Sequence, residues 1–448
     1  MGNLWNRERV LQVAPDAASA KAGEGLASTR KWVSLGYDEI AAWGECHGSG
    51  SKPYQVQVDL REAAFKCSCP SRKFPCKHGI GLMLLFAGGE MSAAPQPAWV
   101  VQWMASRAER QAKKTEKGVD LSPEKLTERA EAKEERRGKR LQQMLQGMED
   151  LRLWLEDLVR GGLASAQTKG FAFFEERARR LVDAQAPGAA RMVREIGSAA
   201  ASGNGWQQRT LEAASLAYLL TEAAARTATL PPELRDDVLS TLGLPTAKQA
   251  IESAPAVPDI WQVLGREIEI EANLKTQRTY LFGLQTQRPA LLLDFAFGKE
   301  ALNVAVPIGT LFPAELTFYP GNSLRAAVRN STLDVAPLTQ LRGPDSIAAM
   351  LDLHARLIGN YPWLAPPAVP LLNVTATVQD DAWWLIDGHG DAIPVATRGS
   401  AGWTALAVSA GKPASFGVTT DGRTCRLLSV IAGGIFTDLH PATEAIAS

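Results

Sequence analysis

The sequence has no net charge, because its 448 residues contain 48 Lys and Arg against 48 Asp and Glu. Overall basicity is therefore no argument for nucleic-acid binding. No run approaches the ~20 apolar residues of a membrane helix, and five cysteines exclude a disulfide scaffold. Residues 1–16 carry charges where a signal peptide would need an apolar run. These absences predict a soluble, cytoplasmic protein with no membrane segment.

The charge is nevertheless uneven along the chain. Residues 1–140 contain 23 basic and 17 acidic residues, a net of +6, whereas residues 141–448 contain 25 and 31, a net of −6. A solvated stretch at residues 105–140, with 12 basic and 8 acidic residues, explains the surplus. A basic front end that meets an anionic partner is the alternative.

Composition divides the chain into four parts, with expected boundaries at residues 1–104, 105–140, 141–257 and 258–448. Ser122 followed by Pro123 is a typical helix start, with a capping hydroxyl before a proline at the first helical position. From residue 141, apolar side chains recur about every 3.6 residues. They are Leu141, Met144, Leu145, Met148, Leu151, Leu155 and Leu158. We therefore expect one long helix over residues 123–160, with its charged first half in solvent.

Helical periodicity continues through residues 141–257. One predicted face, ending before Pro187-Gly188, holds Phe171, Phe174, Ala178, Leu181 and Val182, and a second holds Leu211, Ser215, Tyr218 and Leu219. Apolar stripes at this spacing are typical of helix cores. We expect an all-α block, either a bundle or a solenoid.

The C-terminal part changes period. Ile268 and Ile270 alternate with glutamates, which is typical of a half-buried strand. Further strands are expected at residues 280–285, 290–297, 315–319, 371–378 and 383–386, and the last two are joined by a hairpin turn at 379–381. One helix is expected at about residues 345–358. The pattern predicts a mostly antiparallel β-rich domain.

The residues with the most distinctive chemistry lie between positions 67 and 78. The chain contains five cysteines and five histidines, and four of these ten residues fall in this stretch: Cys67, Cys69, Cys76 and His78. Three thiolates and one imidazole are a usual tetrahedral ligand set for structural zinc. The first two ligands end a strand-like segment, and the last two begin an apolar helix whose N-terminus favours a thiolate. Because four protein ligands leave no position for water or substrate, we predict a structural Zn²⁺ site.

The two remaining cysteines have other expected roles. Cys46-His47 is a candidate replacement ligand or a second, incomplete site, but we expect it to pack beside the finger in a Gly/Ser-rich loop. Cys425 lies in a strand-like segment and is expected to be a core thiol. A redox pair is disfavoured, because the near pair is Cys-x-Cys and a histidine closes the set.

The motif resembles the SWIM zinc finger, which is Cys-x-Cys, a variable gap and then Cys-x-His. Cys67, Cys69, Cys76 and His78 match it in full, with a gap of six residues. Residues 43–54 look like the lead-in of bacterial members, and the rest of the chain, including residues 181–188, is also similar to them. The resemblance implies a ββα finger that binds zinc and interacts with DNA or with proteins. It also points to MoxR-type AAA ATPases and von Willebrand A proteins as candidate partners.

Four cations surround the ligands: Lys66, Arg72, Lys73 and Lys77. They either balance the negative charge of three thiolates or form a small phosphate-binding face, with Phe74 exposed for stacking. The second reading predicts nucleic-acid binding with a steep dependence on salt.

No catalytic constellation stands out. The chain lacks a phosphate-binding P-loop, a Gly-x-Ser-x-Gly elbow and a His-Glu-x-x-His motif, and His354, His389 and His440 are isolated. We therefore expect an α+β multidomain, non-enzymatic interaction protein. Its expected parts are a small ββα zinc finger, an α-helical middle block and a mostly antiparallel β-rich C-terminal domain. A protein partner is favoured, because the chain is neutral and its C-terminal part is acidic. Nucleic-acid binding by the basic finger and an enzyme in the β-rich domain are the alternatives.

Overall fold

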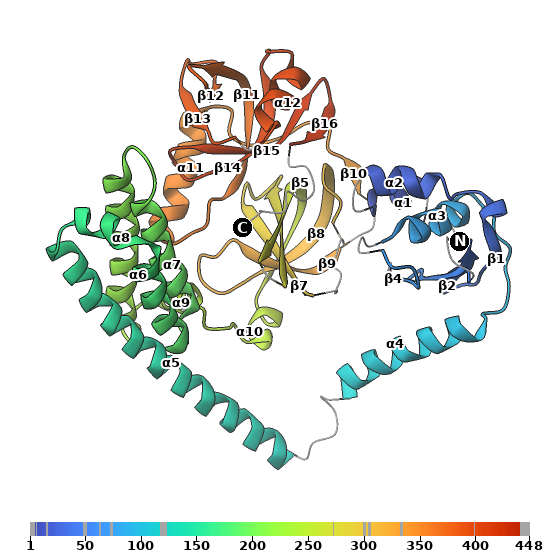
Figure 1. The fold of residues 1–448 in the computed structure, drawn as a ribbon, viewed down its shortest axis with the longest axis horizontal. Helices are drawn as coiled ribbons and strands as arrows, with labels where there is room; N and C mark the ends of the chain where they lie inside the picture. Colours follow the sequence, from blue (N-terminus) through green and yellow to red (C-terminus); the bar gives the residue numbers. More distant parts are fainter. Residues whose placement is uncertain are drawn as a thin grey trace.

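The computed structural model describes residues 5–439 apart from residues 6, 15–16, 48–51, 62–63, 72–74, 117–122, 272, 299–301, 303–305, 332–334 and 398. It contains a small N-terminal sheet with helices, a helical bundle and a β-rich C-terminal region (Figure 1), which confirms the predicted fold class. In Figure 1 the N-terminal unit and the bundle lie on opposite sides of the β-rich region. None of the described helices has the length and apolar character needed to span a membrane.

The N-terminal region is built on a four-stranded sheet. Its elements are α1 (Arg7–Gln12), α2 (Ala17–Glu24), the 3₁₀ turn η1 (Thr29–Lys31), β1 (Trp32–Tyr37), β2 (Ala41–Cys46), β3 (Tyr54–Asp59), β4 (Ala64–Cys67), α3 (Lys77–Ala87) and α4 (Ala98–Glu116). The strands pair antiparallel in chain order, β1-β2-β3-β4. Strands β3 and β4, followed by α3, form the expected ββα unit.

Helices cover both faces of this sheet. Successive strand residues point to opposite faces, so Val56 and Val58 pack with Ile80 of α3. On the other face, Trp43 packs with Val100 of α4. The sheet is therefore the middle layer between α3 and the first turns of α4.

The middle of the chain is a helical bundle. Its helices are α5 (Pro123–Arg160), α6 (Leu163–Asp183), α7 (Pro187–Ala200), α8 (Trp206–Ala225), α9 (Pro232–Leu242) and α10 (Lys248–Glu252). Helix α5 has the predicted extent, and its expected cap, Ser122, lies outside the described residues. Its buried stripe begins at Met144. Pro187-Gly188 does more than end a helix, because it also forms the start of α7.

The bundle packs largely through small side chains. Its core includes Phe174, Ala178, Leu181, Ala189, Ala190, Ala214, Ala217, Leu220 and Ala224. The predicted faces were therefore partly wrong: Phe171 is 63% exposed on α6, and Leu211 and Leu219 are 47% and 42% exposed on α8. Periodicity identified the helices correctly. On α8, however, the large apolar residues that were predicted to be buried lie on the outer side of the helix. Alanines form the inner side because they allow helices to approach closely.

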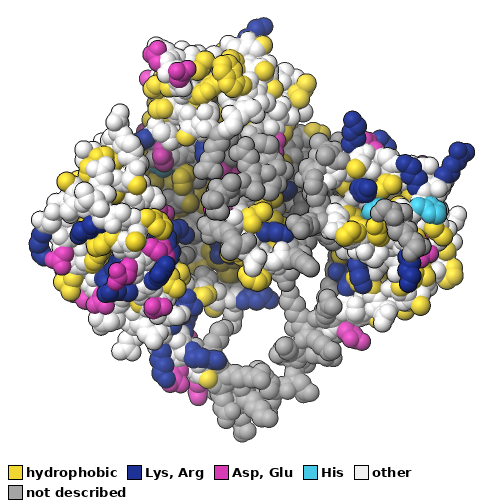
Figure 2. All heavy atoms as spheres, in the orientation of Figure 1, with side chains coloured by type: hydrophobic (Ala, Val, Ile, Leu, Met, Phe, Trp, Pro, Cys, Tyr) yellow, Lys and Arg dark blue, Asp and Glu magenta, His cyan; other side chains and the backbone are white. Residues whose placement is uncertain are grey.

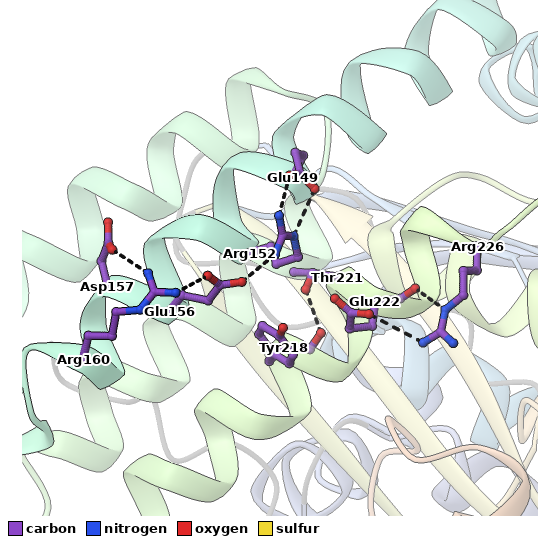
Figure 3. A network of polar contacts seen from close by, with 9 residues as sticks. All are labelled: Glu149, Arg152, Glu156, Asp157, Arg160, Tyr218, Thr221, Glu222 and Arg226. Carbon is purple, nitrogen blue, oxygen red and sulfur yellow. Dashed lines mark hydrogen bonds and ion pairs between the residues drawn. The ribbon is translucent and has the colours of Figure 1, made fainter.

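Ion pairs occupy the outer surface where α5 runs past α8 (Figure 3). The Arg152 guanidinium lies 2.7 Å from Glu149 and 2.5 Å from Glu156, and Arg160 lies 2.9 Å from Glu156. On α8, Arg226 lies 3.7 Å from Glu222. Basic and acidic side chains gather together on this surface of the bundle (Figure 2). Because all of these pairs are at least partly exposed to solvent, each contributes little to stability, and the apolar core carries the bundle.

The C-terminal region contains two sheets, each of which closes on itself. The first comprises β5 (Ala256–Glu271), β6 (Leu274–Gly283), β7 (Pro289–Phe297), β8 (Thr310–Phe318), β9 (Arg325–Ser331) and the short β10 (Ala336–Pro337). After α11 (Ile347–Asn360), the second comprises β11 (Ala368–Gln379), β12 (Ala382–Ile386), β13 (Ala392–Val395), β14 (Ala414–Thr420), β15 (Cys425–Ala432) and β16 (Ile435–Asp438). Helix α12 (Ala401–Ser409) lies between β13 and β14.

Both sheets have the same connectivity. In the first barrel, β5 pairs with β6 and β8, β6 with β7, β7 with β9, and β9 with β8. In the second, β11, β12, β13, β14 and β15 repeat these pairings in the same order. The third and fifth strands are parallel in both barrels, and the other pairs are antiparallel. The C-terminal region is therefore a tandem pair of five-stranded barrels with antiparallel strands appended at their edges.

Details of the second barrel match the predicted hairpin. Asp380 and Asp381 connect β11 and β12 with φ angles of 49° and 58°, as a two-residue turn of the I′ type requires.

Polar contacts join the helical bundle to the C-terminal region. Asp237 of α9 accepts hydrogen bonds from the backbone and side chain of Asn322, each 2.8 Å long. The hydroxyls of Thr241 and Tyr361 are 2.8 Å apart.

Candidate metal centre

The structure brings the four predicted ligands together at one end of the finger sheet. Cys67 is the last residue of β4, and Cys69 follows in the turn after it. Cys76 occupies the N-cap position of α3, and His78 lies in its first turn. The chain reverses between the two pairs, so that both pairs meet although six residues separate Cys69 from Cys76. The strand end and the helix start thus each supply two side chains.

The distances fit a tetrahedral ion. The three sulfur atoms and one imidazole nitrogen lie within 4.8 Å of one another. The His78 Nδ1 atom is 3.8 Å from Sγ of Cys67 and 3.8 Å from Sγ of Cys76. Zinc with Zn–S bonds of about 2.3 Å and a Zn–N bond of about 2.0 Å needs ligand separations of about 3.5–3.8 Å. Small side-chain adjustments would therefore place all four atoms on Zn²⁺.

The electrostatics of the site favour an ion that binds thiolates. Hydrogen bonding from Cys67, helped by His78 and the Gly79 amide, lowers the pKa of Cys76 to about 4 despite burial. The hydrogen bond to Cys76 and burial raise the pKa of Cys67, and burial raises that of Cys69. Without a metal, the three sulfur atoms therefore favour a single shared negative charge. Zinc binding would release the remaining thiol protons, so zinc affinity is expected to fall with falling pH.

Neighbouring side chains hold the ligands in place. Cys76 and His78 are each 5% exposed. The Tyr54 ring of β3 packs 5.0 Å from the His78 ring, measured between centroids. A Cβ atom at Gly79 would lie 3.0 Å from the Phe65 ring, so the glycine lets α3 approach β4 closely. With four protein ligands, the site has no open coordination position and suits a structural ion.

Cys46, Cys425, His47, His354 and His389 lie outside this cluster. Cys46 is buried, and its thiol contacts the His47 carbonyl at 3.6 Å. Burial raises the pKa of the Cys425 thiol to about 12, as expected for a core residue. His389 lies in the turn between β12 and β13, where its amide donates to Asp387 at 2.9 Å.

The predicted basic face is only partly described. Lys66 and Lys77 are exposed on β4 and α3. Arg72, Lys73 and Phe74 lie outside the described residues.

A groove of about 410 Å³ lies on the other side of the sheet, between β3, β4 and α4. Its lining includes Gln55, Gln57, Lys66, Trp99, Gln102 and Trp103. Sequence reasoning missed this groove. The available signal was a pair of tryptophans four residues apart, one helical turn, in the segment after the finger.

A closed set of three cysteines and one histidine on a ββα unit defines a zinc finger, and a helical bundle follows it along the chain. Residues 54–86 match the family model of the SWIM zinc finger, and residues 139–242 match that of the SWIM-associated four-helix bundle domain. No curated protein and no solved structure matches the chain. The chain therefore contains both SWIM domains, and the Cys₃His cluster is a Zn²⁺ site.

Proposed function

We propose that the chain is a non-enzymatic, zinc-stabilised interaction protein of the cytoplasm, whose finger binds a segment of a protein partner. The observation that carries this proposal is the Gln57 side chain. It is only 3% exposed, lines the groove beside α4, and makes no side-chain hydrogen bond within the described part of the chain. The amide of Gln57 therefore has no partner within the described residues and is available to donate to and accept from a ligand in the groove.

The chemistry of the groove suits an extended peptide. A peptide backbone offers alternating N–H donors and C=O acceptors, and the amides of Gln57 and Gln102 can pair with both. Trp99 and Trp103 provide apolar surface for side chains between those contacts. The groove lining includes one cation, Lys66, which is little for a phosphate polymer.

The zinc site supports this groove through β4. Lys66 and Ser68 line the groove, and the ligands Cys67 and Cys69 alternate with them along the same segment. Because alternate strand residues point to opposite faces, zinc on one side holds the backbone that shapes the other. Arg107 of α4 adds a tie to the sheet, 3.6 Å from Asp59.

Crosslinking from inside the groove tests the proposal. We would replace Gln102 by a photo-reactive phenylalanine analogue in the source cells and identify the crosslinked protein. The same adduct should disappear with Trp99→Ala and with His78→Ala, and persist with Trp403→Ala, an exposed tryptophan in α12. A MoxR-type AAA ATPase and a von Willebrand A protein are the first purified partners for titration, because of the family resemblance.

The nucleic-acid alternative has its own signature. We would measure the binding of duplex DNA by the zinc-loaded protein across a salt series, using fluorescence anisotropy. Tight binding that weakens steeply with salt and is lost with Lys66→Gln would show that the finger binds a nucleic acid rather than a protein. If the crosslinked adduct persists in the Trp99→Ala and His78→Ala variants, the groove is not the binding site.

A further inference from the structure

The two C-terminal barrels share their strand order with the OB-type Greek-key barrel. Each has five strands in the spatial order first, second, third, fifth, fourth, and the fourth pairs again with the first. Barrels of this type bind oligonucleotides across the outer face of the second and third strands. Fold alone does not establish a function, so the side chains on that face must show whether it can bind a nucleic acid.

In the first barrel this face is formed by β6 and β7, and it exposes aromatic rings. Phe295 and Phe297 are 50% and 64% exposed, and as alternate residues of β7 they point to the same side. Leu274 of β6 pairs in register with Phe297 and is 39% exposed. Nearer the second barrel, Tyr280 and Leu291 pack into its core. The exposed half is therefore a short aromatic platform.

A cation without a carboxylate partner lies beside this platform. The Arg325 guanidinium is 4.1 Å from the ring centroid of Tyr319 and 5.8 Å from that of Phe295. Its side chain forms no ion pair or hydrogen bond with any described residue. The arginine is thus held by aromatic rings, with its hydrogen-bond donors available to an anion.

Two glutamates of the neighbouring strand β5 are already paired. Glu269 of β5 lies 2.8 Å from Arg278, and Glu267 lies 2.8 Å from Arg426. Neither of these two carboxylates is paired with Arg325.

The second barrel also carries an aromatic residue on this face, on its second strand rather than its third. Trp384 lies on β12, the second strand, opposite Pro394 of β13. Its neighbours Trp383 and Leu385 contact the barrel core, so strand alternation directs Trp384 outward. Both barrels therefore present an aromatic ring on the face of their second and third strands.

We propose that the β6–β7 face binds single-stranded nucleic acid, with bases stacked on Phe295 and Phe297 and a phosphate held by Arg325. Base stacking on exposed rings with arginine on the backbone is the general mode of sequence-tolerant single-strand binding. Strand β6 has partners on both sides, whereas β7 pairs with β9 only at Leu291 and Leu292. Nucleic acid is favoured over an added peptide strand, because main-chain pairing along β7 would leave the exposed rings and the Arg325 guanidinium unused. This site lies outside the finger and does not depend on the groove there.

The test uses the full-length, zinc-loaded protein and a fluorescein-labelled oligothymidylate of about 20 nucleotides, since an OB barrel covers about 4–16. Anisotropy at about 50 mM salt should show binding that weakens as salt rises. Phe295→Leu and Phe297→Leu should each weaken it about tenfold, because leucine keeps the apolar volume and removes the stacking ring. Arg325→Gln should lower the slope of log K against log salt by about 0.7. Phe171→Leu, at an exposed ring of the bundle, should change nothing.

Several results would overturn this assignment. One is no binding at low salt by a protein whose melting profile is normal. A second is undiminished binding by the Phe295→Leu/Phe297→Leu double variant, with oligoglutamate displacing the oligothymidylate equally well, which would indicate a general polyanion effect. A third is binding that survives both leucine variants and vanishes with Lys66→Gln, which would locate it at the finger. Stronger binding of the matching duplex would also contradict a stacking platform.

Discussion

The finger and the bundle differ in what holds their helices in place. In the finger, α3 is tied to β4 by four ligands contributed from a short stretch, Cys67–His78. In the bundle, α5–α8 are held by a continuous core of alanine, leucine and methionine that extends over all four helices. The first arrangement concentrates stability at one point, and the second distributes it. The comparison predicts that the finger fails all at once when that point is lost, whereas the bundle weakens step by step.

Loss of the metal should have the largest effect. Cys69→Ala and His78→Ala should each abolish stoichiometric zinc and unfold β4 and the start of α3, because structural zinc contributes on the order of 10 kcal/mol in small fingers. Zinc content by mass spectrometry and hydrogen exchange resolved by segment measure both effects. Protection of α7 and α8 should stay unchanged, because the bundle has its own core.

Cys46→Ala is the matched control. It removes a buried thiol from the same sheet, but that thiol contacts the His47 carbonyl and lies outside the ligand cluster. The variant should keep one zinc per chain. Loss of the metal from Cys46→Ala, or its retention in both Cys69→Ala and His78→Ala, would show that the ligand set is different.

A core truncation in the bundle should have the next largest effect. Phe174 is 1% exposed and contacts Gly197 of α7, so Phe174→Ala should destabilise the bundle by about 3–5 kcal/mol. Phe171→Ala removes the same ring from a position that is 63% exposed, and its cost should stay within about 0.5 kcal/mol. Denaturant unfolding followed by helix circular dichroism measures both. Equal costs would mean that the outer side of α6 is covered.

This pair of phenylalanines shows where sequence reasoning reached its limit. Periodicity placed both on one helix face. Gly170 has a φ of 69° and interrupts α6, so Phe171 begins the second segment of the helix, and of the two rings only Phe174 lies in the bundle core. On α8 the large apolar residues were predicted to form the buried face, whereas Ala214 and Ala217 occupy it. A helix–helix contact depends on partners that are remote in sequence, and those are not readable from one helix.

The metal centre was predictable for the opposite reason. Its ligands are close in sequence, and their chemistry is unusual enough to stand out in a chain with few cysteines. The groove beside Trp99 and the platform around Arg325 were not predicted. Each requires a strand register, Gln57 opposite Lys66 in one case and Leu291 opposite Arg325 in the other. Such pairings arise only once the sheets close.

The smallest expected effect compares two glycines of the same helix. Gly147 is buried, and a Cβ atom there would lie 2.6 Å from Cβ of Ala184, a side chain that cannot move aside. Gly147→Ala should therefore destabilise the bundle by about 1–3 kcal/mol, even after the gain in helix propensity. A Cβ atom at Gly138 would meet nothing within 4 Å. Two residues later, Arg140 donates a hydrogen bond of 3.2 Å to the Gly243 carbonyl at the end of α9. Gly138→Ala should stabilise the exposed part of α5 by about 1 kcal/mol and leave the unfolding midpoint of the bundle unchanged. Hydrogen exchange over residues 131–140 and thermal unfolding separate the two effects. A rise in the unfolding midpoint with Gly138→Ala would show that the exposed half of α5 unfolds together with the core.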